Sequence, residues 1–284
     1  MKFGVAINCF KIPVEDGIIE ASKIGASGVQ TYATTGAFSP EELTSDKKLL
    51  IKALLKENDL VFTALTADMG GYGFQIEKDN PERIEKTKKI IDLAEEFGAK
   101  VITTHVGVIP SDERHPRYEV LLKALVECGR YAKSKGVTVA IETGPEDAVT
   151  LKGFLDKTLG GVGVNLDPAN FVMVTGQNPA DAVYTLKDYI VHTHVKDGIM
   201  LKKTQPKIIY DHFASGGKGG INVKDYFLET VVGQGDVDYK SYLKALIEVG
   251  YDGYLTVERE SGDDRIGDSI KAIEYVKGVL KELK

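Results

Sequence analysis

The sequence predicts an α/β protein with a single closed (β/α)8 barrel, the TIM barrel, and three observations support this fold. Short apolar runs alternate with longer segments of helical periodicity along the whole chain, which is typical of βα units that build a parallel sheet. No Pro-, Gly- or Ser-rich linker and no shift in composition marks a domain boundary. The 284 residues divide into eight units of about 35 residues, the size of a barrel repeat. We therefore expect residues 1–284 to form one domain, although length alone would also fit two.

Eight apolar segments rich in Val, Ile, Leu, Ala or Thr are the predicted strands. In chain order they are 3–9, 28–33, 60–66, 100–105, 138–143, 161–167, 189–195 and 253–258. Near-continuous apolar runs of this length are typical of parallel strands that are buried on both faces.

Segments with helical spacing lie between these strands. The clearest are 14–24, 40–58, 81–97, 118–135, 238–249 and a C-terminal helix rich in Lys and Glu. Pro81 suits the first turn of its helix and Gly98 suits the end of the same helix. An open dinucleotide-binding sheet would carry a Gly-rich turn after its first strand, where this chain has Cys9-Phe10-Lys11-Ile12. We therefore expect no nucleotide cofactor.

One long stretch without periodicity, about 198–236, separates the seventh strand from the next helix. It predicts an insertion or a lid over the barrel mouth. The stretch contains the sequence SGGKGG at 215–220, in the region where many barrels bind phosphate through backbone N–H groups. A flexible lid is the preferred interpretation, and phosphate binding is the alternative.

Composition excludes several classes of protein. The chain has 42 acidic and 36 basic residues, which gives a net charge of −6, and 43% of its residues are hydrophobic. This composition excludes an intrinsically disordered protein and a membrane-spanning protein. No Lys/Arg run offers a groove for nucleic acid. Cys9 and Cys128 make neither a disulfide framework nor a zinc ribbon, and the first ten residues lack the apolar stretch and cleavage site expected of a signal peptide. We expect a cytoplasmic protein with no nucleic-acid or membrane partner.

Polar side chains that bind metals stand at the ends of the later strands. In a barrel these carboxyl ends meet at one mouth, where active sites are found. The residues concerned are His105, Glu142, Asp167, His192, His194 and Glu258. Taken singly, each is explained about as well by a helix cap or an ion pair at a strand end, but several at successive barrel positions favour a site.

Three carboxylates and one imidazole, those of Glu142, Asp167, His194 and Glu258, are the predicted metal ligands. Three carboxylates do not converge without large pKa shifts or a compensating cation. One nitrogen and three oxygens suit Mn²⁺, Mg²⁺, Co²⁺ or Zn²⁺, and the donor set does not choose among them. The sequence therefore predicts one divalent metal ion of unresolved identity.

Four segments carry a resemblance to a known family: AIETGPE, VNLDPANF, VHTHVKDG and the C-terminal GQGDVDYKSYLKALIEVGYDGYLTVERE. They resemble the sugar phosphate isomerase/epimerase branch of the xylose-isomerase-like TIM-barrel superfamily, which includes ketose 3-epimerases and inosose-processing enzymes. The resemblance covers nearly the whole chain. It implies one divalent metal ion held by Glu142, Asp167, His194 and Glu258, with Glu142 and Glu258 doubling as catalytic acid/base groups on opposite faces of a ketose.

The expected activity is therefore the isomerisation or epimerisation of a ketose, sugar phosphate or cyclitol ketone through an enediolate stabilised by the metal. An inosose-type dehydratase that uses the same metal site is the alternative. An apurinic endonuclease fits less well, because Gln30, Tyr32, Thr66 and Asp68 end the second and third strands and the chain has five histidines. A non-catalytic sugar-binding barrel is the remaining option. Barrels of this kind often form homo-oligomers, although the sequence identifies no interface.

Four further residues are expected to bind substrate: His105, Asn170, Glu146 and Lys196. Each also has a structural interpretation. His105 could be a strand-end histidine, Glu146 a helix cap, and Lys196 part of a surface ion pair with Asp197. Asn170 stands where some relatives carry a histidine, and an amide binds but does not transfer protons. His192 shares a strand face with His194 and is expected deeper in the barrel.

Overall fold

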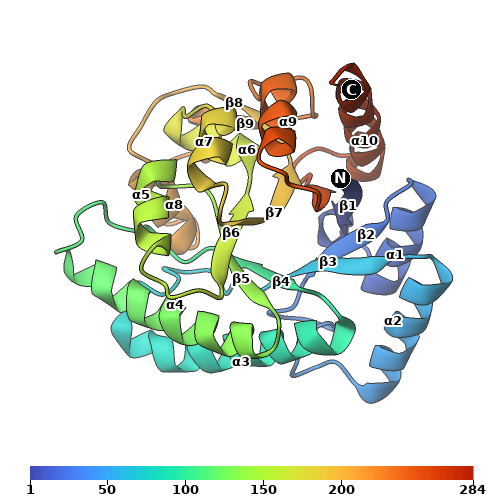
Figure 1. The fold of residues 1–284 in the computed structure, drawn as a ribbon, viewed down its shortest axis with the longest axis horizontal. Helices are drawn as coiled ribbons and strands as arrows, with labels where there is room; N and C mark the ends of the chain where they lie inside the picture. Colours follow the sequence, from blue (N-terminus) through green and yellow to red (C-terminus); the bar gives the residue numbers. More distant parts are fainter. Residues whose placement is uncertain (284) are drawn as a thin grey trace.

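The computed structural model describes residues 1–283, and these residues form a closed barrel of eight parallel strands in the order β1-β10-β7-β6-β5-β4-β3-β2 (Figure 1). The predicted (β/α)8 fold is confirmed. The barrel strands are β1 (Lys2–Ala6), β2 (Gly28–Tyr32), β3 (Val61–Thr66), β4 (Val101–Thr104), β5 (Thr138–Glu142), β6 (Val162–Leu166), β7 (Ile190–Val195) and β10 (Tyr254–Val257).

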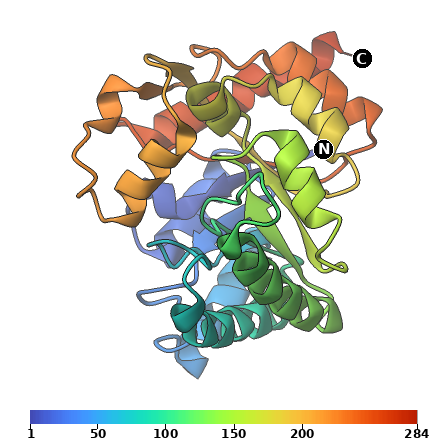
Figure 2. The same ribbon diagram turned by 90° about the vertical axis from the view of Figure 1, so that its left-hand side faces the viewer.

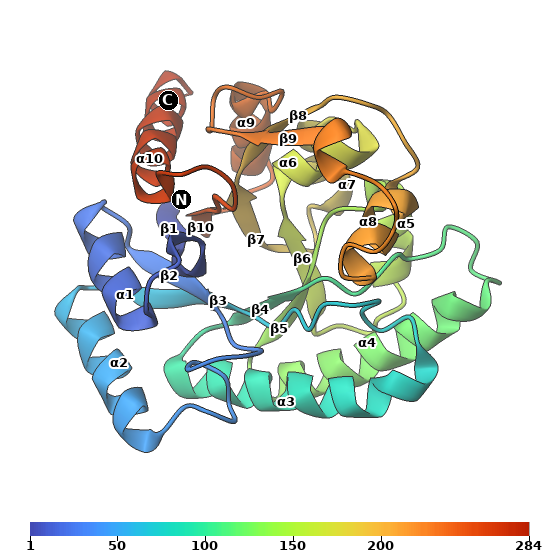
Figure 3. The same cartoon turned by 180° about the vertical axis from the view of Figure 1, so that it is seen from behind.

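Helices surround the strands, as Figures 1 and 3 show from opposite sides. They are α1 (Val14–Lys23), α2 (Ser45–Glu57), α3 (Asn80–Phe97), α4 (Pro116–Ser134), α5 (Ala148–Leu155), α6 (Pro168–Asn170), α7 (Pro179–Leu186), α8 (Pro206–Ala214), α9 (Tyr239–Glu248) and α10 (Arg265–Glu282). The buried apolar faces of the longer helices pack against the barrel and form one continuous core with it, whereas α8 belongs to the insertion between β7 and α9. Within residues 1–283, no helix has the length and apolar character needed to cross a bilayer.

Most predicted strands are one or two residues shorter in the structure, and two elements differ by more. The first strand ends at Ala6, because residues 7–10 form a 3-10 turn that carries the chain away from the sheet. The helix expected from residue 40 begins at Ser45, because the Thr44 side chain accepts a hydrogen bond from the Lys47 N–H and caps it there. Both differences lie at element ends, where caps and turns decide the boundary.

The inside of the barrel is polar near the mouth. Its buried side chains include Gln30, Thr103, Asn165 and His192, which hydrogen-bond to one another or to neighbouring strands instead of packing as an apolar plug. Buried polar groups of this kind are stable only when they are paired. The polar layer therefore forms a floor of fixed geometry beneath the mouth.

The insertion between β7 and α9 has regular structure that its sequence did not predict. Strands β8 (Asp197–Met200) and β9 (Phe227–Thr230) pair antiparallel, with Ile199 opposite Leu228, and α8 lies between them. Strands of four residues are too short to show a hydrophobic period, and the paired residues are about 30 positions apart in the chain. Hydrophobic periodicity therefore does not predict this pair of strands. Figure 2 shows the insertion in orange on one side of the molecule.

Candidate metal centre and cavity

The four predicted ligands come from neighbouring strands of the barrel. Glu142 is the last residue of β5, Asp167 directly follows β6, His194 lies in β7, and Glu258 directly follows β10. In the closed barrel these strands are adjacent in the order β5-β6-β7-β10. Because all of them run parallel, their carboxyl ends meet at one mouth, and the structure brings the four side chains together.

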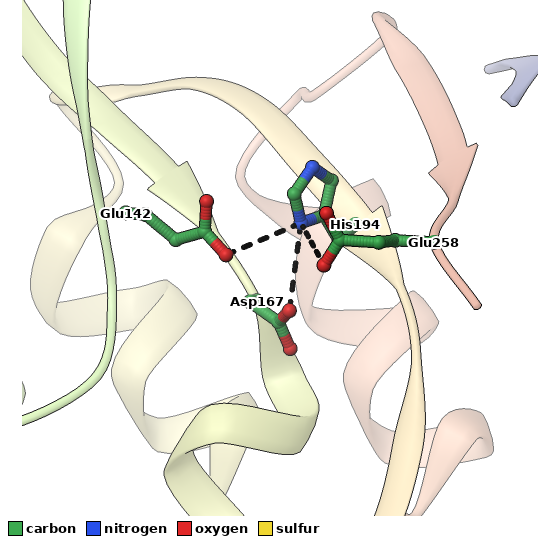
Figure 4. Close-up of side chains that lie close together, drawn as sticks. All are labelled: Glu142, Asp167, His194 and Glu258. Atoms are coloured by element: carbon green, nitrogen blue, oxygen red, sulfur yellow. Dashed lines mark ion pairs between the residues drawn. The ribbon is translucent and has the colours of Figure 1, made fainter. Parts of the chain in front are cut away.

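The side chains of these four residues converge on one point (Figure 4). The His194 Nδ1 atom lies 3.6 Å from Glu142 Oε1, 3.4 Å from Asp167 Oδ2 and 3.4 Å from Glu258 Oε2. All four donor atoms lie within 4.8 Å of one another. Glu142 and Glu258 approach from opposite sides, with the His194 imidazole and the Asp167 carboxylate between them. The arrangement is a cage of one nitrogen and three oxygens.

The hydrogen bonds of Asp167 show whether this cage suits a cation. Its Oδ1 atom accepts hydrogen bonds from the backbone N–H groups of Ala169 (2.8 Å) and Asn170 (3.1 Å). Its Oδ2 atom is buried and has no hydrogen-bond partner among the described residues, although it faces the other ligands. A buried carboxylate oxygen without a partner is costly unless a positive charge compensates it. The donor set and this unpaired oxygen therefore fit a divalent ion.

Gln30 orients the imidazole of His194. The His194 Nε2 atom is 3.2 Å from Gln30 Oε1, and the same oxygen is 2.9 Å from His192 Nε2. Gln30 Nε2 donates to Thr66 Oγ1 at 3.0 Å, so the amide is held with its oxygen toward the two histidines. An amide oxygen accepts only, so this contact favours a proton on His194 Nε2, and Nδ1 is the ring nitrogen that faces the carboxylates. Sequence analysis gave Gln30 no role, because the contact joins residues 164 positions apart.

The three carboxylates also control the protonation of His194. Burial lowers the pKa of His194, but the negative charges of Glu258, Glu142 and Asp167 outweigh it and raise the pKa well above its usual value. A proton and a metal ion therefore compete for the same nitrogen. Burial, together with repulsion from Glu260 and Glu142, likewise raises the pKa of Glu258 against the opposing charges of His194 and Lys196.

Lys196 forms the wall of the centre next to Glu258. Its Nζ atom lies 2.8 Å from Glu258 Oε2 and 3.9 Å from Asp167 Oδ2, and it also pairs with Glu260. The side chain is almost fully buried, so it is no surface ion pair. The sequence predicts that Lys196 binds substrate. The structure places it in the cavity wall, with its charge already shared among carboxylates.

The mouth opens into a cavity of about 870 Å³ that both His105 and Asn170 line. His105 Nδ1 lies 2.9 Å from Asp68 Oδ2, and Asn170 Nδ2 donates to the Thr143 carbonyl at 2.9 Å. Burial lowers the pKa of His105, but Glu142 and Asp68 more than offset this and raise it to about 10. Both predicted substrate-binding residues therefore face the space beside the ligands.

Glu146 lies elsewhere. It does not line the cavity, and its Oε1 atom accepts a hydrogen bond of 2.6 Å from the backbone N–H of Ile109, in the loop after β4. Burial raises the pKa of this carboxyl to about 8, although the Ile109 N–H opposes the shift. Glu146 therefore holds the loop after β4 from a buried position. Contact between Glu146 and the substrate stays a prediction without geometric support.

Asp197 is buried and has a structural role. The sequence allows two roles for it, an electrostatic role near the mouth or a surface ion pair with Lys196. Its carboxylate accepts hydrogen bonds from four backbone N–H groups, those of Gly198, Gly233, Gly235 and Val237, at 2.8–3.1 Å. A Cβ atom on Gly235 would lie 2.2 Å from Asp197 Oδ1, so this loop needs glycine there. The sequence signal was the GQGDV segment, which this contact explains.

The insertion contributes further cavity residues. Tyr210 of α8 lines the cavity close to the backbone of Gly144, where a Cβ atom would lie 1.7 Å from the tyrosine hydroxyl. Glu229 of β9 accepts a hydrogen bond from Arg259 Nη1 at 2.8 Å, and Arg259 Nε donates to Asp268 of α10 at 3.0 Å. This clamp, made of Glu229, Arg259 and Asp268, is buried. It ties the insertion to the residue directly after Glu258.

The Gly-rich segment 215–220 takes no part in the cavity. It follows α8, and none of its residues lines the space above the ligands. Residues of α8 itself, among them Ile209, Tyr210 and Phe213, line that space instead. The cover over the mouth is therefore made by a helix, and the structure offers no phosphate cradle from the glycines.

Fold and site together define a TIM barrel with a candidate divalent-cation site at the carboxyl ends of its strands. Residues 18–278 match the family described as xylose isomerase-like TIM barrel. The chain belongs to this family, which confirms the resemblance seen in the sequence.

Individual relatives are distant. The chain is 24% identical over 266 residues to fructoselysine 3-epimerase of Shigella flexneri, covering 87% of this chain and 86% of that protein. It is 29% identical over 171 residues to inosose dehydratase of Clostridium perfringens, covering 56% of this chain and only 54% of that enzyme. A solved xylose isomerase domain protein from Planctomyces limnophilus has a TM-score of 0.80 at 23% identity, over 99% of this chain and 97% of that one. The relatives include sugar epimerases and dehydratases, so the chain is related to sugar-processing enzymes.

Proposed function

We propose that the protein is a divalent-metal-dependent isomerase or epimerase of a ketose or cyclitol ketone. The observation that carries the proposal is the convergence of Glu142, Asp167, His194 and Glu258 on one point at the mouth of a cavity large enough for a sugar. Asp167 Oδ2, buried without a partner, supports a cation at this point. The relationship to a fructoselysine 3-epimerase supports the reaction class.

Glu142, Asp167, His194 and Glu258 would hold the metal ion. When bound, a divalent ion polarises a ketose carbonyl and stabilises the negative charge that develops when the neighbouring C–H loses its proton. Mn²⁺, Mg²⁺, Co²⁺ and Zn²⁺ all suit the donor set.

The two glutamates supply the proton transfers. They face the same point from opposite sides, so one removes a proton from one face of a substrate carbon and the other returns a proton to the opposite face. Burial and neighbouring carboxylates raise the pKa of Glu258, which makes this carboxyl a better proton acceptor than one in water. Lys196 holds Glu258 in place through their 2.8 Å ion pair.

A dehydratase is the second candidate, and one feature of the cavity favours it. Loss of a hydroxyl group needs an acid to protonate the leaving oxygen, and His105, supported by Asp68, supplies a third proton-transfer group in the cavity besides the two glutamates. In an epimerase the same imidazole would bind a hydroxyl group. The matched inosose dehydratase agrees with this alternative.

Proton exchange in deuterated water tests the proposal. We expect the metal-loaded protein to exchange a carbon-bound proton in at least one of a panel of ketoses, ketose phosphates and inososes, and a chelator to abolish this exchange. Epimers or isomers as products identify the first candidate, and an unsaturated or dicarbonyl absorbance identifies the dehydratase.

Glu142→Gln and Glu258→Gln should each lower the exchange rate at least about 100-fold. Measuring the metal content of each variant separates loss of the ion from loss of the proton acceptor. The exposed-surface change Glu127→Gln is the matched control and should leave the rate unaltered. Wild-type turnover in both glutamine variants, each with bound metal, would refute the mechanism.

A further inference from the structure

Three independent features of the cavity restrict the chemistry of its substrate. They are the loops that bind phosphate in other barrels, the net charge of the cavity wall, and the apolar surface at the rim. The inference drawn from them rests on the proposed function, because it names the substrate class of that same site.

The first feature is the place where barrels usually bind phosphate, the loops after the last two strands and the helix that follows them. Here the loop after β10 carries Glu260 and Asp263 into the cavity. At the start of α10 the Asp264 side chain already accepts the Gly267 N–H, at 2.9 Å. With segment 215–220 also outside the cavity, both places that bind phosphate in other barrels are unsuited to it here.

The second feature is the charge of the cavity wall. Within residues 1–283, the wall carries seven carboxylates against three Lys or Arg side chains. The protonated His105, which also lines the cavity, adds a fourth positive charge, and a divalent ion would offset two of the three negative charges that remain in excess. Lys196 is already paired with Glu258 and Glu260, which leaves Lys224 and Arg265 facing a surplus of carboxylates. A phosphate group, with a charge of about −1.5 to −2 at neutral pH, is repelled by such a wall.

The third feature is an apolar rim, defined here as Met173, Val174, Ile209, Phe213, Phe227 and Leu228. Phe213 is 53% exposed and Leu228 is 50% exposed, whereas Asp167 and His194 at the floor are fully buried. The predicted metal-ligand side chains lie at the floor, and the exposed Phe213 and Leu228 lie among the residues nearer to solvent. A cavity of about 870 Å³ is near the upper end of the range for pockets that enclose drug-sized ligands.

We infer that the substrate is an unphosphorylated keto sugar or cyclitol ketone that carries an apolar substituent. Its polar ring occupies the floor beside Glu142 and Glu258, and its substituent packs against Phe213 and Leu228. Contact with the substituent buries these two side chains, which accounts for large apolar residues being exposed at the mouth of a polar site.

Three forms of one ketohexose test the inference: the free sugar, its terminal phosphate ester and its terminal benzyl ether. We expect kcat/KM for proton exchange to rank benzyl ether above free sugar above phosphate ester, each by at least about tenfold. Burying about 100 Å² of an aromatic group suffices for a factor of this size. Titration calorimetry on the metal-loaded protein should give the same order of Kd, which keeps the test valid for a compound that binds without reacting.

Rim variants locate the effect. Phe213→Ser and Leu228→Ser should each reduce the preference for the benzyl ether over the free sugar at least about threefold. Ile208→Ser is the matched control, since Ile208 is exposed on the same helix and does not line the cavity. It should leave the preference unchanged.

Three outcomes would overturn the inference: a phosphate ester that is the best substrate, a benzyl ether no better than the free sugar, or rim variants that leave the preference intact. Exchange of the free sugar with no benzyl preference would refute the inference alone. Absence of exchange in every compound would refute the proposed function, while the order of Kd would still decide the inference.

Discussion

Two buried aspartates, Asp167 and Asp197, lie 30 positions apart in the chain and are both fully inaccessible to solvent, yet their surroundings differ. Both oxygens of Asp197 are occupied, by four backbone N–H groups. Asp167 has one occupied oxygen and one that faces two glutamates and an imidazole without a hydrogen bond. The first carboxylate organises a loop, and the second keeps one oxygen free of hydrogen bonds among the described residues, 3.9 Å from Lys196 Nζ and open to a divalent cation.

The comparison shows that burial and charge do not separate a structural carboxylate from a functional one. Both side chains are buried acids that follow strand residues near the mouth, and both stand in segments that carried the family resemblance. What separates them is whether the protein itself satisfies every oxygen. A residue that the fold leaves incomplete is a better guide to function than its burial alone.

The largest expected effect is on the stability of the protein and comes from Asp197, whose carboxylate oxygens all accept hydrogen bonds. Asp197→Asn places an NH₂ group against two backbone donors, so we expect a loss of about 2 to 5 kcal/mol in the free energy of unfolding. Urea unfolding followed by circular dichroism measures this. Asp236→Asn, in the same loop but exposed, should change it by less than about 0.5 kcal/mol. Equal values for the two variants would remove the distinction between Asp197 and Asp167.

Asp167→Asn should show the opposite pattern. We expect metal affinity to fall at least about 100-fold, because an anionic ligand is lost. Stability of the metal-free protein should fall less than in Asp197→Asn, because the amide oxygen still accepts the Ala169 N–H and only the attraction of the carboxylate to Lys196 and His194 is lost. Competition with a chelating dye measures the first quantity and urea unfolding the second. A metal-free variant as unstable as Asp197→Asn would show that Asp167 is structural.

A smaller effect on metal affinity is expected at Gln30, which contacts the ligand His194 but is not itself a predicted ligand. Gln30→Met removes the acceptor that keeps the proton of His194 on Nε2, so metal affinity should fall about tenfold. Gln30→Glu keeps an acceptor oxygen and should restore most of that affinity. Wild-type affinity in the methionine variant would show that the amide does not orient His194.

The smallest effect concerns Glu146, whose carboxyl has a folded-state pKa of about 8 against 4.5 for an ordinary glutamate. Between these values the folded protein binds more protons than the unfolded chain, so stability falls as pH rises from about 4.5 to about 8. Glu146→Gln should remove this dependence, so the stability of the variant relative to the wild type should rise as pH rises from about 4.5 to about 8. Melting temperature against pH measures it. If the variant instead raises KM and keeps the wild-type pH profile, Glu146 binds substrate.

Much of this centre was predictable because parallel strands obey a simple rule. Glu142, Asp167 and Glu258 end or directly follow their strands, and strand ends can be located from apolar runs. What escaped prediction depends on closure of the barrel or on long-range pairing. Gln30 meets His194 only when β2 and β7 share one lumen, and β8 meets β9 across a segment of 26 residues. The position of Glu146 is set by a backbone N–H in a loop that carries no sequence signal.

The clamp of Glu229, Arg259 and Asp268 constrains how such a barrel can be re-engineered. Exchanging the insertion between relatives is an obvious route to new specificity, because the insertion supplies the rim. Here a graft of residues 197–237 alone would strip Arg259 of the Glu229 carboxylate and release the backbone beside Glu258. The insertion, Arg259 and Asp268 are one transplantable unit, and a chimaera has to move them together to keep Glu258 in place.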